Sequence, residues 1–326
     1  MEFHRVLAGD ERRIGRGVLA ILLLLGGMLV LGFLVSQGAA LVDQQLGRTN
    51  PTWGGTDVTP VYQAGNMLSL ALLVPWSAII HRWLYRVPAA SLHSVSSRFR
   101  FEVLGRAVVL VTPLWVLVVV TSTAVPDQVP WSPADLVTMF ALTIILTPLQ
   151  SAGEEYGLRG LVFRVAGSWS RGPRAGLVVG VLVSSVVFVG LHLSSDPWRN
   201  LYYLAPAVSF AIITWRTGGL EVAVAVHALN NTLLFLFDTL MHSDFPSLQE
   251  RSTGGDALLL VPTGALAVIT AAVWWRTRRS GPLLTPGPGS FSRAGRPPRG
   301  RRSLAPAGRW RRPGRGPHPG CAAGRC

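Results

Sequence analysis

The sequence predicts an all-α integral membrane protein, a polytopic bundle of about eight transmembrane helices. Of its 326 residues, 49% are hydrophobic and 14% are charged, and the mean hydropathy is +0.38. A typical soluble domain carries about 25% charged residues. This composition, the long apolar runs and the distribution of arginine all indicate that lipid is the main solvent of the chain.

Eight apolar runs are the candidate spanning helices. Crossing a hydrocarbon layer about 30 Å thick takes about 20 helical residues, and the fourth, fifth and sixth runs are short or interrupted by this measure. The runs cover residues 17–41, 62–84, 103–124, 133–149, 176–192, 201–215, 219–240 and 257–275. They predict a single membrane domain over residues 1–275.

The positions of arginine predict the orientation of the spans. The chain has 30 arginines and no lysine. With the N-terminus inside, the inner segments carry 14 arginines and the outer segments carry three, Arg48, Arg199 and Arg251. Positive residues favour the cytoplasmic side, so we expect a multi-pass protein of the cell membrane with both termini cytoplasmic.

Residues 276–326 differ in composition from the rest of the chain. They hold the other 13 arginines, many Pro and Gly residues, and no Asp or Glu. Such a segment cannot bury enough apolar surface to fold, so we predict a disordered cytoplasmic tail. Its charge favours contact with anionic lipid headgroups and indicates no specific nucleic-acid partner. Both cysteines lie here, so the membrane domain has no cysteine-based disulfide or metal site.

The first candidate site residues follow the fourth apolar run. An ionisable residue in a spanning helix indicates function, because burying a charge in hydrocarbon is costly. Glu154 and Glu155 begin the sequence E-E-Y-G-L-R, which ends at Arg159. Glu155 and Arg159 have the spacing and order of a favourable helical ion pair. We expect Arg159 to neutralise Glu155, which leaves Glu154 as a general base; an ordinary juxtamembrane charge cluster is the alternative.

Two further polar groups lie at or inside later runs. His192 ends the fifth run in F-V-G-L-H, and His227 and Asn231 lie one helical turn apart in the seventh, in H-A-L-N-N. Taken singly, they are also typical of an interfacial histidine and of a helix–helix hydrogen bond. A carboxylate, two imidazoles and a carboxamide together can activate water and stabilise an oxyanion.

The ordered set E-E-x-x-x-R, F-x-x-x-H and H-x-x-x-N resembles the motifs of the CAAX protease and bacteriocin-processing (Abi) family, in particular the CAAX prenyl endopeptidase type. The segment Thr217–Leu220, followed by A-V-A-V-H-A-L-N-N, also resembles that family. The resemblance covers residues 133–240, which we take as the catalytic core. It implies an intramembrane endopeptidase that cleaves a peptide or protein, prenylated or not, with Glu155 and Arg159 shaping the site.

The resemblance also implies roles by motif position. Glu154 would activate the attacking water, and His192 would help to hold it. His227 and Asn231 would stabilise the tetrahedral oxyanion. Glu154, His192 and His227 also resemble the first ligand shell of a zinc hydrolase, although H-E-x-x-H is absent. Catalysis with no cofactor and catalysis with a divalent metal such as zinc both fit these residue types.

Hydropathy alone places Glu154 near the inner end of its span and His192 near the outer end of the next. Straight, perpendicular helices would hold the two side chains too far apart for one site. We therefore expect the fourth helix to continue through Glu154 to about Val165. We also expect the fifth helix to tilt, so that both groups meet in a water-filled cavity.

Two other functions use the same residues. In a transporter or channel, the buried Glu and His would form a proton or ion relay, although the sequence has no internal repeat of the kind common in carriers. A non-catalytic membrane scaffold or immunity protein would keep the fold without activity. The sequence does not specify the substrate.

Overall fold

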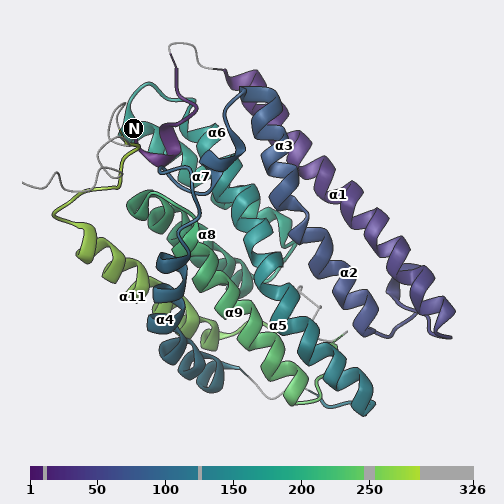
Figure 1. The fold of residues 1–326 in the computed structure, drawn as a ribbon. Helices are drawn as coiled ribbons and strands as arrows, with labels where there is room; N and C mark the ends of the chain where they lie inside the picture. The colour runs from purple at the N-terminus through teal and green to yellow at the C-terminus, as the bar shows by residue number, and fades with distance from the viewer. Residues whose placement is uncertain (10–12, 124–126, 246–253, 287–326) are drawn as a thin grey trace, which may run out of the picture. The chain divides into compact units, whose positions relative to one another are not determined.

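The computed structural model describes residues 1–9, 13–123, 127–245 and 254–286 (Figure 1). Most of these residues lie in helices. No strand forms among these residues, and three isolated bridges are their only β-type pairing. The longer helices are α1 Ile14–Gln45, α2 Pro60–Ala71, α3 Leu73–Tyr85, α4 Phe101–Ser122, α5 Pro133–Glu155, α6 Phe163–Gly167, α7 Pro173–Leu191, α8 Pro197–Thr217, α9 Glu221–Leu240 and α11 Leu260–Thr277. The predicted all-α bundle is confirmed.

Among the described residues, seven helical stretches are long and apolar enough to cross a membrane. They are Ile14–Gln45, Pro60–Tyr85, Phe101–Ser122, Pro133–Gly167, Pro173–Leu191, Glu221–Leu240 and Ala257–Thr277. The predicted run at 201–215 is not among them. It does form a helix, α8, but polar residues interrupt that helix and lower its hydropathy. The sequence predicts eight spans, whereas the described residues contain seven candidate spans.

Large apolar side chains cover the outside of the helices, while polar side chains lie inside. Leu29, Leu110 and Val186 are 69%, 79% and 70% exposed. Fully buried polar residues include Thr147, Glu155 and Arg159. Water would reverse this distribution, whereas lipid favours it. The chain is a multi-pass protein embedded in a membrane.

Proline begins several of the helices that carry or flank the site. α2, α5, α7 and α8 each have Pro near their first position, where the missing N–H costs no hydrogen bond. Thr59, Ser132 and Asp196 cap three of these helices by accepting a hydrogen bond from a backbone N–H of the first turn.

The helical segment that carries the two adjacent glutamates continues beyond them. After α5 the chain continues as a π-helical segment, Tyr156–Val162, and then as α6. The predicted continuation of this helix to about Val165 is confirmed. A π-helical segment inside an α-helix is often found at a functional site, and here it begins directly after Glu155.

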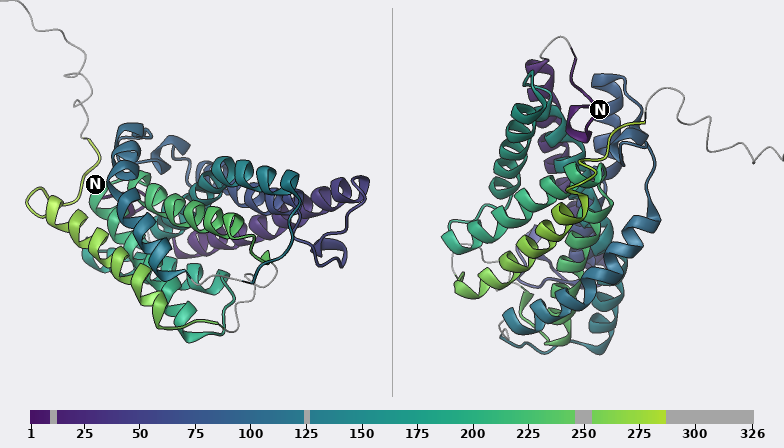
Figure 2. Two further views of the ribbon diagram at one scale, coloured as in Figure 1. Left: turned by 90° about the horizontal axis from the view of Figure 1, so that it is seen from below. Right: turned by 90° about the vertical axis from the view of Figure 1, so that its left-hand side faces the viewer.

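α5 lies at the centre of the bundle, packed along α9 on one side and α2 on the other. α1 covers α2, α4 covers α9, and α11 packs against α8 and α4. Figures 1 and 2 show α5 and α9 running side by side, with α1–α3 to one side of them and α4 and α11 to the other.

The segment after α11 pairs with two other parts of the chain. The Leu283 N–H donates to the Arg216 carbonyl, at 3.2 Å, and the Thr285 N–H donates to the Met1 carbonyl, at 2.8 Å. These bonds hold residues 283–285 beside the end of α8 and beside Met1. The rest of the predicted tail, residues 287–326, lies outside the described residues.

Gly153 permits the close crossing of α5 over α2, one residue before Glu154. A Cβ atom at this position would overlap the backbone carbonyl of Leu70. Gly153→Ala should therefore force the helices apart and destabilise the fold by about 1–3 kcal/mol, as overpacking does in other cores. Thermal unfolding of the protein in detergent would measure the loss.

Gly105→Ala is the matched control, because a Cβ atom on Gly105 of α4 meets nothing within 4 Å. This change should be neutral or slightly stabilising, since alanine favours the helix over glycine. If neither variant changes the unfolding temperature, the close crossing at Gly153 is contradicted.

Candidate active site

A cavity of about 680 Å³ lies among α1, α2, α5, α7, α8 and α9. Glu154, His192, His227 and Asn231 all line it. They come from α5, the residue after α7, and α9. The structure thus brings the four candidate residues to one cavity, including the two that hydropathy places at different depths.

Glu155 and Arg159 form an ion pair at the base of this site. The Arg159 Nη1 donates to Glu155 Oε1 at 2.9 Å, and both side chains are fully buried. The predicted pairing across four residues is therefore present. Because Arg159 is engaged with Glu155, Glu154 has no arginine partner in its own motif.

Several elements enclose the Arg159 guanidinium. Its Cζ atom lies 4.6 Å from the centroid of the Phe188 ring and 5.3 Å from that of Phe210. Its Nη2 donates to the Pro206 carbonyl at 3.2 Å. Cation–π contact and this hydrogen bond replace part of the hydration that burial removes. One side chain thereby fixes α7 and α8 against the π-helical segment.

Glu154 lies half-buried on the cavity wall. Gln150, one turn earlier on α5, donates from Nε2 to Glu154 Oε1 at 3.1 Å. Glu154 Oε2 is 3.9 Å from His227 Nε2. This carboxylate thus keeps one oxygen held by an amide, while the other faces an imidazole beside the cavity.

His227 presents a different nitrogen to each glutamate. Its Nδ1 lies 2.8 Å from Glu155 Oε1. A carboxylate accepts, so Nδ1 carries the proton and Nε2 is the atom presented toward Glu154 and the cavity. The Phe210 ring stacks on the imidazole at 5.4 Å between centroids. The orientation of this ring is fixed on two sides.

A short hydrogen-bond relay orients Asn231. The Tyr202 hydroxyl donates to Asn230 Oδ1 at 3.1 Å, and Asn230 Nδ2 donates to Asn231 Oδ1 at 2.8 Å. Since the Asn231 oxygen accepts in this relay, its amide N–H groups are the donors available to a ligand. That is the polarity required to stabilise an oxyanion.

His192 directly follows the last residue of α7. Its Nδ1 donates to the Phe188 carbonyl at 2.8 Å, which leaves Nε2 as the accepting nitrogen. The ring lies against Tyr203, with centroids 3.9 Å apart. These contacts hold the ring at the wall of the cavity.

The candidate metal ligands do not form a metal site. Within the described part of the chain, no three His, Cys, Asp or Glu side chains are grouped as a metal ion requires. His227 Nδ1 is engaged with Glu155, and its Nε2 lies 3.9 Å from Glu154 Oε2. The proposed reaction uses no metal.

Four residues outside the three motifs also line the cavity: Gln150, Tyr202, Tyr203 and Asn230. Gln150, Tyr203 and Asn230 contact Glu154, His192 and Asn231, and Tyr202 contacts Asn230. Each lies in or beside an apolar run as an isolated polar or amphipathic side chain. Their polarity inside such a run was a usable signal, but only the packing shows which of them reach the site.

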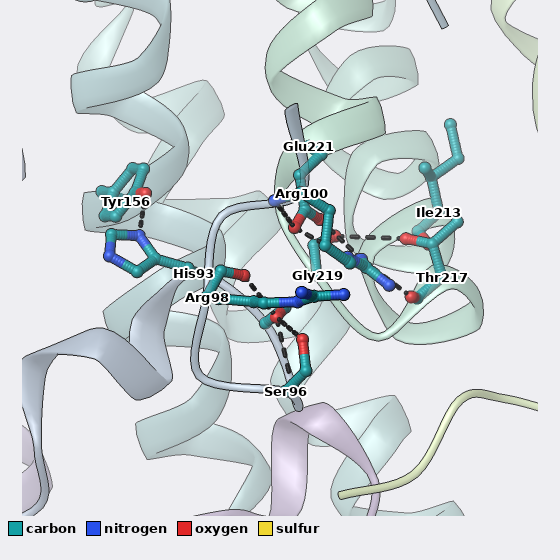
Figure 3. Close-up of polar contacts among 10 residues, drawn as sticks. His93, Ser96, Arg98, Arg100, Tyr156, Ile213, Thr217, Gly219 and Glu221 are labelled. Atoms are coloured by element: carbon teal, nitrogen blue, oxygen red, sulfur yellow. Dashed lines mark hydrogen bonds and ion pairs between the residues drawn. The ribbon is translucent and has the colours of Figure 1, made fainter. Parts of the chain in front are cut away.

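A cluster at the end of α5 and the start of α9 holds these two helices in place (Figure 3). Arg100 donates to both oxygens of Glu221, the first residue of α9, from Nε at 2.8 Å and Nη2 at 2.6 Å. In the same loop, His93 hydrogen-bonds the Tyr156 hydroxyl at the start of the π-helical segment. Burial lowers the pKa of His93, and the nearby Glu221 carboxylate partly offsets this effect.

Residues 133–233 match the model of a protein family described as Rce1-like, Type II CAAX prenyl endopeptidase Rce1-like. The resemblance drawn from the three motifs is thereby confirmed over this segment. The matched segment contains all six candidate residues. This segment is thus similar to a family of CAAX prenyl endopeptidases.

A Bacillus subtilis (strain 168) protein named "Uncharacterized protein YyaK" is 27% identical over 147 residues. The alignment covers 43% of this chain and 49% of that protein, so the chain spans about half the length of this curated relative. No solved structure matches the chain.

The Arg159 ion pair predicts a large effect on stability. Removing one partner of a buried pair leaves an uncompensated charge, which costs about 3–5 kcal/mol. Arg159→Met should lower the unfolding temperature accordingly, and Glu155→Gln in the same chain should restore part of it. Thermal unfolding in detergent would measure both changes.

Arg174→Met is the control, because Arg174 is exposed near the start of α7. If Arg159→Met and Arg174→Met had equal effects, the buried pair would not contribute as proposed.

Proposed function

We propose that the chain is an intramembrane endopeptidase of the cell membrane that cleaves a peptide or protein with a glutamate-activated water. The observation that carries the proposal is the position of Glu154. It faces a cavity shared with two imidazoles and a carboxamide, while Arg159 neutralises the adjacent Glu155. The family match over residues 133–233 supports the same reaction class.

In the proposed reaction, a water molecule binds beside Glu154 in the cavity, and His192 helps to hold it. Its oxygen bonds to the carbonyl carbon of the substrate as Glu154 takes its proton. The carbonyl oxygen becomes an oxyanion, which the Asn231 amide stabilises together with His227. In this role His227 is an imidazolium, with the Nδ1 proton held by Glu155 and a second proton on Nε2 directed to the oxyanion. The C–N bond then breaks, and Glu154 returns the proton to the leaving nitrogen. Water supplies every atom that the products gain.

The paired Glu155 supports this chemistry without contacting the substrate. Its carboxylate accepts from His227 Nδ1, so it fixes the ring plane and directs Nε2 to the cavity. A positioned donor needs no reorganisation during the reaction, which is the main source of electrostatic stabilisation in enzymes.

Glu154→Gln should reduce peptide cleavage by about 10²–10⁴-fold, the usual contribution of a general base. Peptides that accumulate uncut in membranes of a strain carrying this variant would identify substrates, and the purified protein in lipid nanodiscs should cleave them. Glu102→Gln is the control, because it removes an exposed carboxylate at the start of α4, outside the cavity. Full cleavage by Glu154→Gln would exclude the proposed base.

Asn231→Ala should lower kcat by about 10²-fold with little change in KM, because its amide acts on charge that develops in the transition state. Asn231→Asp preserves the size of the side chain but removes its N–H donors, so it should lose as much activity. Steady-state kinetics on one identified peptide would measure both. A raised KM with unchanged kcat would instead assign Asn231 to ground-state binding.

A further inference from the structure

One carboxylate on the cavity wall has no part in the proposed chemistry. Asp238 lies near the end of α9 and lines the same cavity as Glu154. No other described residue gives its carboxylate a hydrogen bond or ion pair. A charged group in a spanning helix is costly unless it faces a cavity or a partner, and such groups generally serve function.

Asp238 shares a helical face with the proposed oxyanion donors. His227, Asn231, Leu234 and Asp238 are spaced by four, three and four residues, and all line the cavity. This spacing places them in one row along α9. At about 1.5 Å per residue, Asp238 lies about 10 Å beyond Asn231 along the helix axis. An extended peptide covers this distance in about three residues, at about 3.3 Å each.

Three other acidic residues near this end of the helices have structural partners. Asp43 accepts from the side chains of Asn50 and Thr59. Asp135 pairs with Arg48, and Asp196 caps α8. Asp238 differs from all three, because its carboxylate is directed to the cavity without a bond that stabilises the fold.

The charges on the cavity wall favour a cationic ligand. Among the described residues that line it, Glu154 and Asp238 are acidic and none is arginine, although the chain as a whole carries a net charge of +14. The cavity also includes neighbours suited to an ammonium or guanidinium group. These are the amides of Gln63 and Asn66, and the aromatic rings of Tyr62, Phe235 and Phe245.

We infer that Asp238 forms a subsite for a cationic side chain, Lys or Arg, in the peptide substrate, about three residues from the cleaved bond. The inference rests on the proposed function, because it assigns this cavity to a peptide. The Asp238 carboxylate binds the cation, and the aromatic rings enclose it. Substrates with a neutral residue at that position leave Asp238 without a partner.

A binding experiment tests the subsite independently of cleavage. The protein carries Glu154→Gln, so that bound peptide is not cut, and is held in lipid nanodiscs. Fluorescent peptides carry Lys or its neutral analogue norleucine at each position in turn. One position should show at least about a 10-fold preference for Lys, which corresponds to about 1.4 kcal/mol.

Three added variants identify the group responsible. Asp238→Asn should reduce the ratio of the two dissociation constants to about one, whereas Asp238→Glu should retain the preference. Asp57→Asn, which removes an exposed carboxylate outside the cavity, should leave the ratio unchanged. Circular dichroism and thermal unfolding would confirm that each variant is folded.

The inference fails if no position prefers Lys, or if Asp238→Asn keeps the full preference. The proposed function is tested separately by cleavage. It is contradicted if Glu154→Gln cleaves peptides as fast as the protein with native Glu154. A Lys preference that depends on Asp238, in a protein that cuts no peptide, would establish the cation subsite and reject the hydrolase.

Discussion

The Arg159 guanidinium is fully buried between two aromatic rings, where water cannot offset its charge. Its free energy therefore depends on the groups packed around it. Glu155 supplies the counter-charge, and the Pro206 carbonyl supplies a further acceptor. Because these groups come from different helices, the arrangement of α7, α8 and the π-helical segment is set by the need to satisfy one cation.

His227 extends the same cluster to α9. Its hydrogen bond to Glu155 joins the imidazole to the ion pair, and Phe210 contacts both the guanidinium and the imidazole. The two adjacent glutamates consequently differ in environment. Glu155 is buried among structural partners, whereas Glu154 lies on the cavity wall. A one-residue step along a helix, which rotates a side chain by about 100°, separates the ion-paired acid from the acid on the cavity wall.

The loop before α4 further stabilises the positions of Glu154 and His227. Arg100 binds the first residue of α9, and His93 from the same loop contacts Tyr156, which follows Glu155 (Figure 3). The loop thus connects the two elements that carry Glu154 and His227. At the other side of α5, Gly153 allows α2 to approach closely enough to close the cavity wall.

The sequence by itself determined the class of fold, the helix that continues past Glu154, and the Glu155–Arg159 pair. These depend on hydropathy and on spacing within one helix, which are local properties. The sequence pattern also predicted a spanning helix at residues 201–215. α8 forms there, but it carries polar side chains such as Tyr202, which hydrogen-bonds Asn230 beside the cavity. That contact depends on the neighbouring helix rather than on α8 alone.

Only the tertiary structure decided which side chains share the cavity. Tyr202 orients Asn231 through Asn230, and Asp238 lines the cavity without a partner among the described residues. It also decided against a grouping of Glu154, His192 and His227 as metal ligands within the described residues. These relations join residues that are far apart in the sequence. They follow from how helices cross and rotate against one another, which residue spacing within a single helix does not specify.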